Sequence, residues 1–135
     1  MTRSTDHATF LRRSLQLDGI ASALCGLIML AGAPLISPLI GLTRPAIAMA
    51  VGGGLLVYAG ALLWNARRPT ISRTEVLVAV VLNAAWVAGS LVLIVDGPLT
   101  MIGNVAVAAI AAAVLLFAVL EGVGLRRLRA ASPIS

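Results

Sequence analysis

Residues Met101–Leu120 read MIGNVAVAAIAAAVLLFAVL, a run of twenty residues without a charge or a proline. A helix rises about 1.5 Å per residue, so about twenty apolar residues cross the roughly 30 Å hydrocarbon layer of a bilayer. Three more uncharged stretches of similar length cover residues 19–43, 45–66 and 76–95. Every charged residue lies between these stretches or beyond them. The sequence therefore predicts four membrane-spanning helices.

The composition predicts one integral membrane domain that covers residues 1–135. The chain is 60% hydrophobic and only 11% charged, which is unlike a soluble globular domain. Four spans use most of the chain and leave no room for a domain outside the membrane. We expect an all-α fold, a four-helix transmembrane bundle, with helices at about 8–33, 44–67, 72–96 and 99–129.

The arginines predict the orientation of these helices. Nine of the ten lie near the N-terminus, in the middle loop or near the C-terminus, which share one side of a four-span chain: Arg3, Arg12, Arg13, Arg67, Arg68, Arg73, Arg126, Arg127 and Arg129. Only Arg44 lies on the other side. The positive-inside rule then places both termini in the cytoplasm, in a plasma (inner) membrane. Topology explains the basic charge without nucleic acid, and the same face can contact anionic lipids.

Prolines set the length of the first helix. Pro34 and Pro38 should end it or kink it sharply near Ala33. The uncharged part before that point is too short to span, so the helix must include Ser14–Asp18, which draws Asp18 into the inner boundary of the membrane. Residues 34–42 are apolar and should form a short proline-containing segment at the outer interface.

Two acids near the cytoplasmic helix ends, Asp18 and Glu121, are the candidate functional residues. Arg13, Arg67 and Arg68 should lie at similar depth, so the first expectation is buried ion pairs with these arginines. The alternative is that both acids face a cavity and bind a proton, another cation or a basic solute. An intramembrane acid is consistent with either reading.

The third helix carries a polar stripe that includes Glu75, Asn83 and Ser90. Their spacing places them on one face, which should contact protein because an amide within the membrane needs a partner. Ser72 and Glu75 also match a capping box at the start of this helix.

The second helix carries a row of small residues at four-residue spacing. Ala46, Ala50 and Gly54 form this row, and Ala48 and Gly52 form another. Small residues at this spacing let transmembrane backbones approach closely. We expect the first row to be a packing seam within the bundle, with a dimer seam as the alternative.

The chain lacks the side chains that most catalytic and cofactor sites require. It has one cysteine, Cys25, and one histidine, His7, so a thiol–disulfide enzyme, bis-histidine haem and a histidine metal site are excluded. We expect no enzyme activity, cofactor or metal. The leading hypothesis is a protein that acts by association, as a homo-oligomer or as an accessory subunit of another membrane protein. The alternative is a minimal oligomeric transporter or channel that uses Asp18 and Glu121. A cavity that reaches either acid would favour transport.

The arginine distribution makes a topology prediction. In a Cys25→Ser background, a cysteine at Gly97 should react with a membrane-impermeant maleimide from the outside of intact cells, and one at Arg67 only after permeabilisation. Labelling of the Gly97 cysteine only from the cytoplasmic side would contradict this topology.

Overall fold

The computed structural model describes residues 2–131, which form five α-helices and no strand. The helices are α1 (Thr2–Ala31), α2 (Ala33–Ile40), α3 (Pro45–Arg67), α4 (Arg73–Asp96) and α5 (Met101–Ala131). Within this part of the chain, α1, α3, α4 and α5 are long and apolar enough to cross a membrane. The predicted all-α fold with four spans is therefore confirmed. The first helix begins at Thr2 rather than near residue 8, because no proline or glycine interrupts the chain before Gly19.

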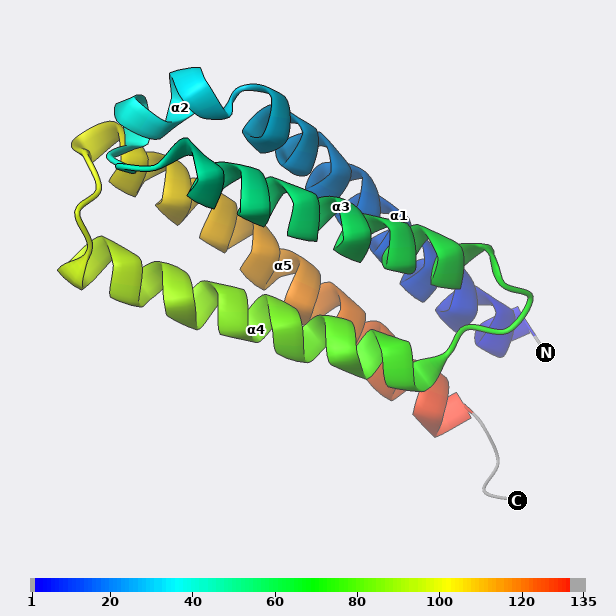
Figure 1. Cartoon of the computed structure of the whole chain (residues 1–135). Coiled ribbons are helices and arrows are strands. Elements are labelled where there is room, and N and C mark those ends of the chain that lie inside the picture. The colour runs from blue at the N-terminus through cyan, green and yellow to red at the C-terminus, as the bar shows by residue number, and fades with distance from the viewer. Residues whose placement is uncertain (1, 132–135) are drawn as a thin grey trace.

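The four long helices lie side by side (Figure 1), and their contacts follow the order α3, α1, α5 and α4. Helix α1 packs along α3 and also against α5, and α5 packs along α4, whereas α3 and α4 make few contacts although a short loop connects them. The two ends of the described chain and the α3–α4 loop lie at one end of the bundle, and α2 lies at the other (Figure 1). This arrangement gathers the three arginine groups at one end.

Reciprocal close approach of two glycines holds α1 against α3. A Cβ atom added to Gly26 would lie 2.8 Å from the Gly52 carbonyl oxygen, and one added to Gly52 would lie 2.7 Å from the Gly26 carbonyl oxygen. Ala48 and Gly52 are both buried. The contact between the helices therefore depends on residues without a side chain at this level.

The other small-residue row of α3 lies elsewhere than expected. Ala46, Ala50 and Gly54 are exposed, and a Cβ atom on Gly54 would have no neighbour within 4 Å. The intramolecular seam runs through Ala48 and Gly52 instead. Both rows have the same spacing, and the deciding factor is Gly26 on α1, which gives only the second row a backbone to approach.

Helix α2 covers the end of the bundle opposite the termini. Pro34 occupies its first turn, and Gly41 ends it with a φ of 93°, which is strained for residues with a side chain. Thr100 fixes α2 to the start of α5: its backbone N–H donates to the Ile40 carbonyl at 3.2 Å and its hydroxyl donates to the Leu39 carbonyl at 2.6 Å. The expected proline-containing segment at 34–42 is thus a short docked helix.

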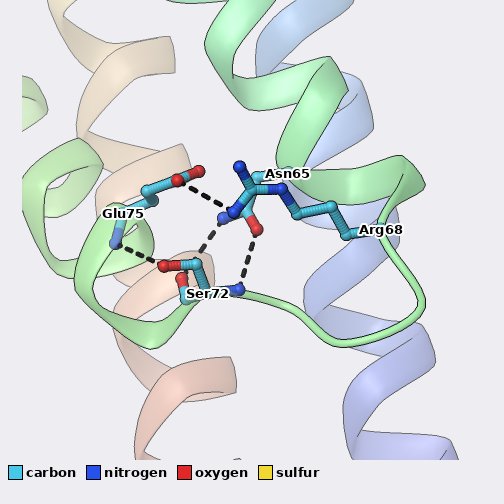
Figure 2. Close-up of polar contacts among 4 residues, drawn as sticks. All are labelled: Asn65, Arg68, Ser72 and Glu75. Atoms are coloured by element: carbon cyan, nitrogen blue, oxygen red, sulfur yellow. Dashed lines mark hydrogen bonds and ion pairs between the residues drawn. The ribbon is translucent and has the colours of Figure 1, made fainter.

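Side chains organise the α3–α4 loop (Figure 2). The Asn65 amide closes the loop, because its Oδ1 accepts from the Ser72 N–H at 2.8 Å and its Nδ2 donates to the Ser72 carbonyl at 3.2 Å. Ser72 Oγ accepts from the Glu75 N–H at 3.4 Å, as the capping box predicts. The Glu75 carboxylate, however, pairs with Arg68 at 3.1 Å, and both side chains are nearly half exposed.

The α1–α3 contact predicts opposite effects for adjacent glycines. Gly52→Leu should destabilise the bundle by roughly 1–3 kcal/mol or more, because the new side chain would push two backbones apart. Gly53→Leu should have little effect, since a Cβ atom there meets no atom within 4 Å. Thermal melting of both variants in detergent checks this, and equal melting temperatures would contradict the role of Gly52.

Candidate functional site

A cluster of polar side chains lies inside the bundle, with one member from each spanning helix. Asp18 comes from α1, Tyr58 from α3, Asn83 from α4 and Glu121 from α5. The exposed fractions of Asp18, Asn83 and Glu121 are 2%, 5% and 0%. We refer to these four residues as the buried polar cluster. Hydrogen bonds join its members across the interior of the bundle.

Asp18 is well supplied with hydrogen-bond donors. Its Oδ1 accepts from the Ser22 hydroxyl at 3.1 Å, and its Oδ2 accepts from Asn83 Nδ2 at 3.0 Å. The Tyr58 hydroxyl lies 3.0 Å from Asp18 Oδ2 and 2.9 Å from Asn83 Oδ1. A hydroxyl has one proton, so Tyr58 donates to only one of these oxygens at a time. Asp18 is thus bonded to its own helix and to two others.

Glu121 is less well satisfied than Asp18. Its Oε2 accepts a long hydrogen bond of 3.4 Å from Asn83 Nδ2. Its Oε1 is buried without a hydrogen-bond partner in the described structure. The Asn83 amide therefore bridges the two carboxyl groups, and one Glu121 oxygen has no donor.

The arginines do not approach these acids as expected. Among residues 2–131, neither Asp18 nor Glu121 has an arginine within ion-pair distance, and Arg68 pairs with Glu75 instead. Arg13 and Arg67 are exposed. Asp18 and Glu121 lie five residues, or about 7 Å along the helices, inward from Arg13 and Arg126. The arginines therefore remain at the end of the bundle while the acids lie within it.

Arg12 has a structural role at that end. Its guanidinium donates to the carbonyls of Ala66, Arg68 and Pro69, with distances of 2.8 Å to Arg68 and 3.4 Å to Pro69. These carbonyls lie at or just beyond the end of α3, where the helix leaves acceptors unsatisfied and the dipole favours a cation. Arg12 thus joins α1 to α3 and does not pair with Asp18 or Glu121.

A cavity of about 510 Å³ adjoins the buried polar cluster. Asp18, Ser22, Tyr58 and Asn83 form its polar side. The rest of its lining is almost wholly apolar: Ala21, Cys25, Val51, Gly54, Leu55, Leu82, Ala85, Trp86, Ile110, Ala113, Val114 and Phe117. Glu121 does not line the cavity, so a molecule in the cavity could contact Asp18 but not Glu121.

Five exposed residues line the cavity: Ala21 on α1, Gly54 on α3, Leu82 and Ala85 on α4, and Ala113 on α5. Of the adjacent spans, α3 and α4 pack least, which favours access to the cavity between these two helices. Because both helices are candidate spans, access from this side would be from the bilayer rather than from bulk water. An apolar molecule in the membrane could reach the cavity from the side.

The polar stripe of α4 divides between two environments. Asn83 and Ser90 are buried, and the Ser90 hydroxyl donates to the Trp86 carbonyl of its own helix at 2.7 Å. Glu75 lies in the first turn of α4 at the arginine-rich end, where it pairs with Arg68. The structure thus places Asn83 in the buried polar cluster, and Trp86, three residues further along α4, lies in the cavity wall.

Tyr58 and Ser22 complete the site, and neither was predicted as a site residue from the sequence. A signal for Ser22 exists, because Asp18, Ser22 and Cys25 follow the four- and three-residue spacing of one helix face, and all three line the cavity. Tyr58 is the only tyrosine and lies in the middle of an apolar span. A hydroxyl at that depth needs a partner, although its identity cannot be read from spacing.

Comparisons with protein-family models, with curated proteins and with solved structures give no match. We therefore infer function from the chemistry of the buried polar cluster and of the cavity beside it.

The bridging position of Asn83 makes a stability prediction. Asn83→Leu should destabilise the protein by roughly 1–3 kcal/mol, because both carboxyl groups lose a donor in a buried place. Ser90→Ala is the control, since that buried hydroxyl bonds only to its own helix. Unfolding in detergent followed by circular dichroism should show a loss only for Asn83→Leu. Equal stability of the two variants would mean that the bridge contributes nothing.

Proposed function

We propose that this multi-pass membrane protein binds a cation at Asp18 and Glu121 and transports it across the membrane. The observation that carries the proposal is a pair of buried carboxyl groups without an arginine partner in the described structure, one of which faces a cavity. Two uncompensated negative charges are costly within a bilayer. A proton or another cation from outside the chain is the compensation that remains.

The cluster supports transport rather than a purely structural role. Arginine could have neutralised either acid permanently, and ten arginines are present, yet those near the cluster serve the bundle end. A site that binds and releases a cation would be blocked by an arginine that stays paired with its acid. Neither binding nor release requires a covalent step, so the proposed role of the protein is that of a carrier and not of an enzyme.

The orientation and membrane in this proposal follow from charge. The arginine-rich end lies in the cytoplasm, with both termini there, and the membrane is the plasma (inner) membrane. Exposed arginines at that end, such as Arg13 and Arg67, support contact with anionic lipid headgroups.

Association with a second copy is the other proposed feature. The exposed row of Ala46, Ala50 and Gly54 is uncovered within one chain, and such rows often mediate helix–helix contact in membranes. This row supports a homo-oligomer more directly than an accessory subunit of another complex. The large apolar surfaces of α3 and α4 would contact lipid or that copy.

Reconstitution into liposomes tests the transport proposal. Proton or cation flux driven by a pH gradient should fall at least about tenfold in Asp18→Asn and in Glu121→Gln, an effect of about 1.4 kcal/mol or more. A pH-sensitive dye inside the vesicles, with membrane potential clamped, measures the flux.

Glu75→Gln is the matched control, because Glu75 is an acid at the surface of the same protein and pairs with Arg68. It should retain wild-type flux. Equal flux in all four proteins would refute cation transport at the cluster and leave association as the function.

A further inference from the structure

We propose that the cavity binds a monovalent organic cation with an apolar body, its charged group on Asp18 and its body between α3, α4 and α5. This inference rests on the proposed transport function and names its substrate class. Three observations carry it: the distribution of polar atoms around the cavity, the unpartnered atoms near it and the direction in which it opens.

Apart from the Trp86 indole, the strong hydrogen-bonding groups of the cavity wall gather around Asp18. Asp18 with its donors Ser22 and Asn83 forms this polar side, and apolar side chains such as Leu55 and Val114 form most of the rest. A bare metal cation prefers several oxygen ligands around it, and the described residues contain no group of three or more metal-ligating acids, histidines or cysteines. A cation that carries its own apolar surface matches both parts of the wall.

Trp86 adds an aromatic surface and an unused donor. Its indole Nε1 is buried without a hydrogen-bond partner in the described structure, and its side chain lines the cavity with Phe117. Trp86 lies three residues after Asn83, so both occupy the same face of α4. An aromatic face attracts a quaternary ammonium group.

The two acids then have different roles. Asp18 forms part of the cavity wall and can contact the ligand directly. Glu121 is 0% exposed, does not line the cavity and shares the Asn83 amide with Asp18, so it influences the site through that amide and through its charge. Asp18 should therefore be essential for ligand binding, whereas Glu121 should modify it.

The ligand reaches the cavity from the bilayer between α3 and α4. Gly54 lines the cavity, is exposed, and has open space where a Cβ atom would be. A large side chain at this position would fill the opening without disturbing the packing of helices within one chain. Gly60, on the same helix, also has open space around it but does not line the cavity, which makes it a matched control.

Binding can be measured with three small probes. Benzyltrimethylammonium carries both charge and apolar body, tetramethylammonium carries the charge alone, and neopentylbenzene carries the body alone. A Trp64→Phe background leaves Trp86 as the only tryptophan, and Trp64 is 64% exposed, so this change should be tolerated. In lipid nanodiscs, benzyltrimethylammonium should alter the Trp86 fluorescence in a saturable way and bind at least about tenfold more tightly than either other probe.

Variants in the same background test where the probe lies. Asp18→Asn should weaken benzyltrimethylammonium binding at least about thirtyfold, the effect expected for loss of a buried charge partner. Glu121→Gln should retain binding within about tenfold. Gly54→Leu should abolish binding while the helical content of the protein stays unchanged, and Gly60→Leu should bind as the parent does.

The outcomes separate this inference from the proposed function. If Asp18-dependent proton flux persists while benzyltrimethylammonium does not bind, the substrate class is wrong and cation transport stands. Equal binding in Gly54→Leu and Gly60→Leu would also overturn the inference, since the probe would then lie outside the cavity. If Asp18→Asn and Glu121→Gln leave the flux unchanged, the proposed function fails first.

Discussion

Two carboxyl groups are buried among the membrane-spanning helices. The free-energy cost of burying them is the constraint on which the interior of this bundle depends. Asp18 and Glu121 are 2% and 0% exposed, and no arginine pairs with either in the described structure. Hydrogen bonds from Asn83, Tyr58 and Ser22 reduce this cost without removing it. Each spanning helix contributes one member of the buried polar cluster, so these bonds also fix the relative depth and rotation of the four helices.

Small residues stabilise the contact between α1 and α3, whereas hydrogen bonds between polar groups join α3 to α4. Gly26 and Gly52 bring α1 and α3 together by backbone contact, as is common where the hydrophobic effect offers little between helices in lipid. Between α3 and α4 no such seam forms. There, Tyr58 bonds to Asn83 within the membrane, and the Asn65–Ser72 bonds close the loop at the end. Weak packing along this pair of helices leaves the cavity open.

Hydropathy and prolines predicted the fold, because length and apolarity restrict a membrane chain to few solutions. The spans, the end of the first helix (predicted near Ala33 and found at Ala31) and the grouping of arginines at one end all followed from sequence. The site was predicted only in part. Asp18, Glu121 and Asn83 were singled out, but their partners depend on helix rotation. Spacing alone could not show that Ala48 and Gly52, rather than Ala46, Ala50 and Gly54, face α1.

The prediction that arginines pair with Asp18 and Glu121 is wrong, and the reason explains how the site is built. Arginine near a helix end gains more from carbonyls and headgroups than from entering the hydrocarbon region, and Arg12 does this with the carbonyls at the end of α3. Asp18 and Glu121 lie deeper in the bundle than the arginines at its end. Besides one another, their polar neighbours are neutral side chains, which can support a carboxyl group whether or not it holds a cation. A bundle built in this way keeps its fold while the charge of its centre changes, which is the property a cation carrier requires.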